Sequence, residues 1–422
     1  MLAAVLLAAA MVELSARVDA EVLARYPRLF GASAGSSRAL LAAIAGAMIT
    51  VAGVTFSITM VAVTQASAQY TPRILRNFMR DRASQVVLGA FVGIFAYCLV
   101  VVRTIRGADE LRFVPSLAVL LGLALAIVGT GVLIFFIHHM ATLLQASSIV
   151  ERVARDTVAA VDRLFPDQVG DDAPPGERDA APAHHGAAAW VPVPAPATGY
   201  IQRVDGAGLL RVAAEHDAVV RMARGVGDFA VEGAPLAWVA SRPGEADGAA
   251  RAAAGAAPLF VLSSYRTVEQ DAAFGVRQLV DVALKALSPG VNDTTTAVTC
   301  VDFLGAVLVR AAGRRIEVPY RAERGVLRVI ACGPTFESLL REAVDEIRQN
   351  ASGNVSVLAR LLETLAAVAA RTPAAGRRRL IEEQVALVAE AAERTVPAPY
   401  DRARLRTLAV TARTAAEPRA AP

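Results

Sequence analysis

Long apolar runs without a single charged side chain occupy nearly half of the first third of the chain. They cover residues 39–63, 86–102 and 113–137. A helix needs about 20 consecutive apolar residues to cross the hydrocarbon core of a bilayer. The pattern therefore predicts three membrane-spanning helices.

A shorter apolar run at residues 2–12 precedes them and is too short to span a membrane. No Lys or Arg comes before it, which is atypical of a signal peptide. We interpret residues 1–12 as a truncated first span, and an ordinary N-terminal helix is the alternative. Residues 1–148 are thus predicted to form a transmembrane region.

The placement of arginine predicts the orientation, because arginine-rich loops are retained on the cytoplasmic side. Four arginines lie between residues 73 and 82, and three more lie between residues 152 and 163. Two predicted spans separate these segments, so both lie on one side of the membrane, opposite the loop at 103–112. We expect that side, and the whole C-terminal part, to be cytoplasmic.

Two patterns link the last span to the rest of the chain. Apolar residues recur at helical spacing from 149 to 165 among charged residues. Residues 166–196 are rich in Pro, Ala, Gly and acidic residues, which is typical of a flexible linker. We predict that 149–196 forms a juxtamembrane helix followed by a linker.

Short β-type runs separated by Gly and Asp then predict a small β-barrel or sandwich module at residues 197–262. One of these runs is Leu209–Ala213. The order of the runs resembles a barrel-sandwich module of the biotinyl or lipoyl type. The carrier form of that module displays a lysine, but the sole lysine of this chain is Lys285, outside the module. We therefore expect no swinging-arm cofactor.

Residues 263–422 are predicted to be mainly helical. Ser288-Pro289-Gly290 ends one helix, and Asn292-Asp293 can cap the next, which starts near Thr294. A hairpin is expected at 315–330. Further helices are expected at 335–349, 355–370, 374–393 and 401–413.

The first full span is unusual because hydroxyl side chains recur along it. Thr50, Ser57 and Thr64 are seven residues apart and fall on nearly one helix face. One interpretation is a tightly packed helix, since small and hydroxyl residues permit close helix contact. The other is a pore-lining stripe, with Gln65 and Gln69 at its cytoplasmic mouth. The spans contain no Asp, Glu, Lys or Arg, which disfavours an active transporter and leaves a passive pore.

A second possible site lies in the soluble part. Arg277 and Asp281 are four residues apart and can pair on one helix face. Asn292 and Asp293 offer oxygen ligands where a helix starts, and a helix N-terminus also presents free N–H groups to an anion. The alternatives are a ligand site and a capped corner between helices.

Composition excludes several classes of function. The net charge of +4 is too small to indicate nucleic-acid binding. Cys98, Cys300 and Cys332 are far apart and match neither a disulfide framework nor a zinc site. The sequence shows no glycine-rich phosphate loop, catalytic triad order or metal-spaced His/Cys set. We expect no enzymatic activity, cofactor or metal.

Three stretches, residues 48–81, 135–147 and 273–298, resemble an uncharacterised family of bacterial predicted membrane proteins, domain of unknown function 2254. The resemblance implies a four-span anchor in the inner membrane and a cytoplasmic domain. The expected fold class is an integral membrane α-helical bundle followed by a cytoplasmic α+β region with a helical C-terminal part. The leading hypothesis is a homo-oligomeric pore or channel-like protein in the lipid bilayer. The alternative is a non-conducting sensor or scaffold that binds a partner or a small ligand.

Overall fold

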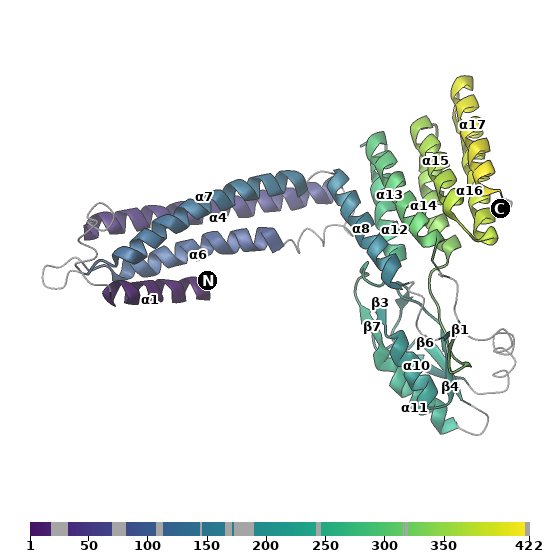
Figure 1. The fold of residues 1–422 in the computed structure, drawn as a ribbon, viewed down its shortest axis with the longest axis horizontal. Helices are drawn as coiled ribbons and strands as arrows, with labels where there is room; N and C mark the ends of the chain where they lie inside the picture. Colours follow the sequence, from purple (N-terminus) through teal and green to yellow (C-terminus); the bar gives the residue numbers. More distant parts are fainter. Residues whose placement is uncertain are drawn as a thin grey trace. The chain divides into compact units, whose positions relative to one another are not determined.

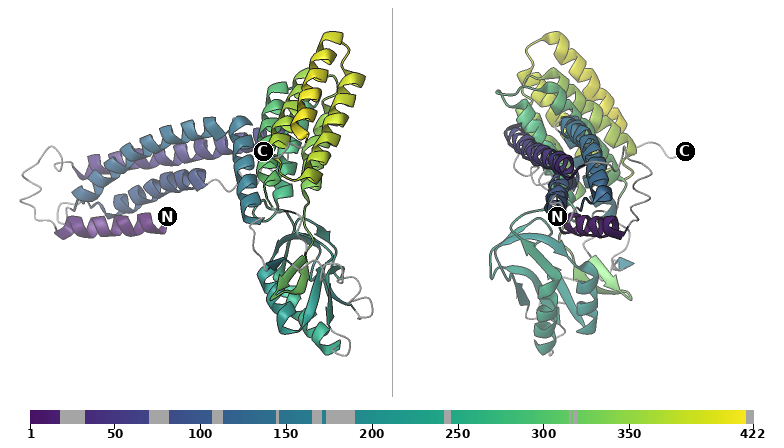
Figure 2. Two further views of the ribbon diagram at one scale, coloured as in Figure 1. Left: turned by 45° about the vertical axis from the view of Figure 1, so that its right-hand side comes forward. Right: turned by 90° about the vertical axis from the view of Figure 1, so that its left-hand side faces the viewer.

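The computed structural model describes most of the chain. The described residues are 1–17, 33–69, 82–106, 113–143, 146–164, 171–172, 190–241, 246–314, 316 and 320–417. They form two compact units, Met1–Ser148 and Ile149–Pro422 (Figure 1 and Figure 2). Most of the predicted linker lies outside the described residues, as do Arg73, Arg76 and Arg80 of the basic loop, so these predictions remain predictions.

The first unit is a bundle of helices that lie side by side (Figure 1). Its helices are α1 (Leu2–Arg17), α4 (Ala34–Gln69), α6 (Arg82–Thr104) and α7 (Ser116–Leu143). As predicted, α4, α6 and α7 are long and apolar enough to cross a membrane. The last of these starts at Ser116 and not at residue 113. Pro115 explains the difference, because the residue before a proline avoids the helical conformation.

Two glycines of α7 allow close contact within this bundle. A Cβ atom on Gly122 would lie 2.8 Å from Cδ2 of Leu41 on α4. A Cβ atom on Gly129 would lie 3.2 Å from Cδ1 of Ile94 on α6. The Tyr97 hydroxyl on α6 donates a hydrogen bond of 2.8 Å to a carbonyl oxygen of α7. Small residues and interhelical hydrogen bonds of this kind hold membrane helices together.

The outer surface of the first unit is apolar. Phe56 is 56% exposed, Ile127 is 67% exposed and Ile134 is 66% exposed. Soluble proteins rarely expose apolar patches of large extent to water. Lipid is therefore the solvent that suits this surface.

The second unit contains two small β-sheets (Figure 1). The strand order is β1-β8-β9-β4-β6-β2 in the larger sheet and β5-β3-β7 in the smaller one. Strands β4 and β9 are parallel, and the other neighbours are antiparallel. The strands are β1 (Asp171–Asp172), β2 (Val191–Pro194), β3 (Gly199–Val204), β4 (Ala218–Met222), β5 (Phe229–Ala230), β6 (Pro235–Ser241), β7 (Phe260–Ser263), β8 (Tyr320–Glu323) and β9 (Val326–Ile330).

These strands do not close into the predicted barrel, within the part of the chain that the structure describes. The assignment of Leu209–Ala213 as a β-type run is wrong, because these residues lie in helix α10 (Gly206–Glu215). The Asp205 side chain caps this helix by accepting a 3.0 Å hydrogen bond from the Gly208 N–H. Leu209, Leu210 and Ala213 are buried together, which is a helical spacing and not an alternation.

Helices form the rest of the second unit. They are α8 (Ala146–Leu164), α11 (Ala246–Ala256), the 3₁₀ turn η1 (Ala257–Leu259), α12 (Ala272–Leu287), α13 (Thr294–Ala312), α14 (Phe336–Asn350), α15 (Val355–Arg371), α16 (Ala375–Thr395) and α17 (Pro399–Ala416). The predicted helices from α12 onward are confirmed to within a few residues. So is the hairpin, which the strands β8 and β9 form around Arg324 and Gly325, both at positive φ.

Helix α13 is also long and apolar enough to cross a membrane by length and composition. It packs instead against α12 and α15 in the second unit. A Cβ atom on its Gly305 would lie 2.5 Å from Cγ2 of Thr364 on α15, so the two helices are in close contact. Its apolar character thus reflects burial among helices of the second unit.

Candidate functional site

The face of α4 that carries the hydroxyl repeat lies on the surface of the first unit. Thr50, Ser57 and Thr64 are all exposed. The opposite face is buried against the other helices, and Leu41 and Met48 lie in the core. The bundle within one chain therefore makes no use of the hydroxyl face.

The three hydroxyls donate hydrogen bonds to carbonyl oxygens of their own helix. Thr50 donates to the Gly46 carbonyl at 2.8 Å, and Ser57 donates to the Gly53 carbonyl at 3.0 Å. Thr64 makes the same bond one turn back, at 2.9 Å. These bonds satisfy the hydroxyl protons without any other helix, so the face tolerates an apolar surrounding.

Two glycines lie on the same side of α4 as the hydroxyls. A Cβ atom on Gly46 or Gly53 would meet no other atom within 4 Å. Together with Thr50 and Ser57 they make a narrow surface that a second helix can approach closely. We call Gly46, Thr50, Gly53 and Ser57 the small-residue face.

The two glutamines of the predicted mouth lie near the end of α4. Gln65 is exposed. Gln69 is the last residue of the helix, and the structure describes its backbone but not its side chain. The structure thus places both after the hydroxyl repeat.

Arg277 is the centre of an ion-pair cluster, and its predicted pairing with Asp281 is confirmed at 2.7 Å. Its guanidinium also donates to Glu342 at 3.2 Å and to both carboxylate oxygens of Glu346 on α14. The hydrogen bonds to Glu346 and Asp281 raise the pKa of Arg277 above its ordinary value. Because one guanidinium joins two helices, the cluster acts as a structural link between α12 and α14.

Of the other predicted pair, Asp293 caps α13, as expected. The Asp293 carboxylate accepts hydrogen bonds from the Thr296 hydroxyl at 2.6 Å and from its N–H at 3.0 Å. The bond from the hydroxyl lowers the pKa of Asp293. Asn292 has a positive φ, which asparagine adopts more readily than most residues.

The two pairs serve different elements. The Asp293 N–H donates to the Ala286 carbonyl at 2.8 Å, beside the last turn of α12. Arg277 lies nine residues before Ala286 on α12, which is about 14 Å along the helix. The structure therefore separates the Arg277 cluster from the Asp293 cap, and the geometry favours the structural interpretation of each.

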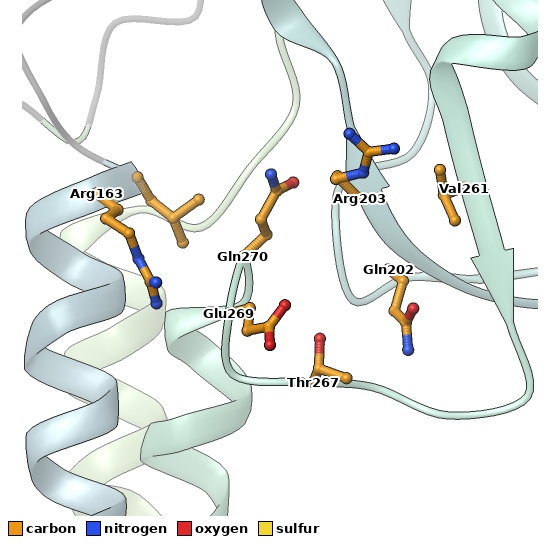
Figure 3. Close-up of a pocket in the computed structure, with 8 residues that line it drawn as sticks. Arg163, Gln202, Arg203, Val261, Thr267, Glu269 and Gln270 are labelled. Carbon is orange, nitrogen blue, oxygen red and sulfur yellow. The ribbon is translucent and has the colours of Figure 1, made fainter.

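Sequence reasoning missed a cavity of about 330 Å³ in the second unit. It lies where the end of α8, strands β3 and β7 and the loop before α12 come together (Figure 3). Its polar lining consists of Arg163, Gln202, Arg203, Thr267, Glu269 and Gln270. These residues come from separate segments of the sequence. Only Thr267, Glu269 and Gln270 lie close together in the chain, and such a short polar group is weak evidence for a binding site.

The family described as predicted membrane protein (DUF2254) matches residues 1–367. The chain belongs to this family. Its membership agrees with the apolar helices of the first unit and identifies it as a membrane protein that resides in a lipid bilayer.

DUF2254 relatives in mycobacteria are similar over most of the chain. An uncharacterized protein of Mycobacterium tuberculosis is 35% identical over 379 residues, which cover 89% of this chain and 72% of the relative. An uncharacterized protein of Mycobacterium bovis has the same identity and coverage. No solved structure matches the chain. The DUF2254 match ends within α15, so α16 and α17 lie beyond it.

Proposed function

We propose that the protein is a homo-oligomeric pore of the bacterial inner membrane, in which copies of α4 surround a narrow central pathway and turn the small-residue face toward it. The second unit is its cytoplasmic regulatory domain, and the protein catalyses no reaction. The observation that supports this proposal is the exposure of Thr50 and Ser57 on a face that the chain's own bundle leaves uncovered.

The glycines of α4 favour contact between copies. A glycine inside a helix costs about 1 kcal/mol relative to alanine. Gly46 and Gly53 have room for a Cβ atom, so packing within one chain does not require them. Close approach of a second helix is a physical reason for both.

Oxidative cross-linking tests the contact between copies. We expect Ser57→Cys to form a disulfide-linked dimer in native membranes, because close α4 helices bring the two Cα atoms within about 7 Å. The matched control is Ile127→Cys, on an exposed position of α7. Both variants carry Cys332→Ser, since Cys332 is an exposed free cysteine. Equal cross-linking at both positions, or none at Ser57, contradicts the proposal.

Planar-bilayer recording tests conduction. We expect the purified oligomer to conduct, and Ser57→Ala and Thr64→Ala to change its unitary conductance or ion selectivity, because each removes an oxygen from the pathway. Thr59→Ala is the matched control. The Thr59 hydroxyl makes the same bond to its own helix, at 2.8 Å, but lies on the opposite side of α4. An oligomer that stays closed at every voltage and pH contradicts the pore.

A second candidate function is a non-conducting sensor or scaffold. The cavity of the second unit supports it, because its polar groups provide hydrogen-bond donors and acceptors for a small molecule. Loss of the pore hypothesis would leave this candidate in place.

A further inference from the structure

We propose that the cavity at the end of α8 binds a small amphoteric solute, one that carries both a carboxylate and an ammonium group and has the size of a free amino acid. The proposal deepens the second candidate function, sensing by the second unit. It does not depend on conduction.

The charges of the cavity point to this chemical class. Arg163 and Arg203 supply positive charge, and Glu269 supplies negative charge. Among the described residues, none of the three has an ion-pair partner within 4.0 Å. In the view of Figure 3, Arg163 lies on one side and Arg203 on the other, with Gln270 between them and Glu269 below Gln270. A guanidinium binds a carboxylate by paired hydrogen bonds, and a carboxylate binds an ammonium group.

The size and the wall of the cavity restrict the solute further. Its volume of about 330 Å³ is near the lower end of the range for ligand cavities. Leu164 and Val261 form the apolar part of the described lining, which contains no aromatic ring. A compact polar molecule suits a lining of this size and composition.

Hydrogen bonds hold the loop before α12 in place on strand β3. Gln202 donates to the Tyr265 carbonyl at 3.2 Å. The Gln270 side-chain oxygen accepts from the Val204 N–H at 3.3 Å, which leaves the Gln270 NH₂ group as a donor. Glu269 is therefore carried by a loop that is fixed before any solute binds, which reduces the entropy lost on binding.

A salt bridge anchors the end of the same loop. Arg266 contacts both carboxylate oxygens of Asp271, at 2.7 Å and 3.0 Å. Asp271 also caps α12 by accepting from the Phe274 N–H at 2.9 Å. The loop is thus held by hydrogen bonds to β3 and by the Arg266–Asp271 salt bridge at the start of α12.

Isothermal titration calorimetry on the full-length protein in detergent tests the proposal. The probes are the twenty common amino acids, each added alone, with succinate and cadaverine as compounds that carry only one of the two charges. We expect at least one amino acid to bind with a Kd of about 1 mM or tighter. Succinate and cadaverine are expected to bind at least about tenfold more weakly.

Variants locate the binding. We expect Arg203→Gln and Glu269→Gln each to weaken it by about tenfold or more, because each removes one charged hydrogen-bonding group that faces the solute. Arg211→Gln on α10 and Glu232→Gln are matched controls at exposed positions outside the cavity, and both are expected to bind like the wild type.

Three results would overturn the proposal. They are the absence of binding by every amino acid, equal binding of succinate, and equal weakening by the control variants. Calorimetry measures binding of the solute directly. Absence of binding would therefore count against this proposal alone, and absence of conductance in bilayers would count against the pore alone.

Discussion

Replacing Gly275 with alanine is expected to lower the free energy of unfolding of the second unit by about 3 kcal/mol, the upper end of the usual range for overpacking. A Cβ atom at Gly275 on α12 would lie 2.0 Å from Oγ1 of Thr157 on α8 and 2.8 Å from its Cβ. Thr157 is fully buried. Rotation of its side chain cannot move its Cβ atom, so the two helices must separate.

The measurement uses the buried thiol of Cys300 on α13 as a reporter. Full-length protein in detergent is heated, and labelling of Cys300 is followed by peptide mass analysis. Gly376→Ala on α16 is the matched control, because a Cβ atom there meets nothing within 4 Å. Gly376→Ala is expected to raise the free energy of unfolding of the second unit by up to about 1 kcal/mol.

A second variant makes this test specific to the contact. Thr157→Gly removes the side chain that the new methyl group would strike. We expect it to restore part of the stability lost in Gly275→Ala, as coupled neighbours do in a double-mutant cycle. Independent, additive losses would show that α8 and α12 do not meet at this point.

Replacing Arg377 with methionine is expected to cost about 3 kcal/mol, because hydrogen bonds to a buried charged group contribute more than neutral ones. Arg377 on α16 is 8% exposed. Its guanidinium donates to the carbonyls of Ala312 and Arg314 at 2.9 Å and lies over the Phe336 ring. It thereby satisfies carbonyls at the end of α13, where a positive charge also suits the helix dipole.

Arg379→Met is the matched control, since Arg379 is exposed on the same helix. Its effect is expected to stay within about 0.5 kcal/mol, as for most surface substitutions. The same Cys300 labelling measures both variants. Equal unfolding temperatures for the two would show that the contacts of Arg377 contribute little.

The helices were predictable where the signals are local. Three apolar runs gave the long helices of the first unit, and Asp293 and Thr335 mark helix starts because their side chains accept from backbone N–H groups three residues on. Helix α10 was missed because Leu209–Ala213 is a short, mostly apolar segment, and periodicity over so few residues does not distinguish a helix from a strand.

The sites were less predictable because they depend on tertiary contacts. The Arg277–Asp281 pair follows from helical spacing, but its partner Glu346 is 69 residues away in the chain. The cavity unites Arg163 with Gln202 and Glu269, and no spacing rule connects such distant residues. Which side of α4 faces outward likewise became apparent only from the packing of the bundle.

The bonding of the α4 hydroxyls has a consequence for charge preference. A hydroxyl has one proton and two lone pairs. Thr50, Ser57 and Thr64 direct the proton back to their own helix, so they turn electron-rich oxygen toward whatever lies opposite. A conduit lined in this way attracts cations and repels anions without containing a single carboxylate.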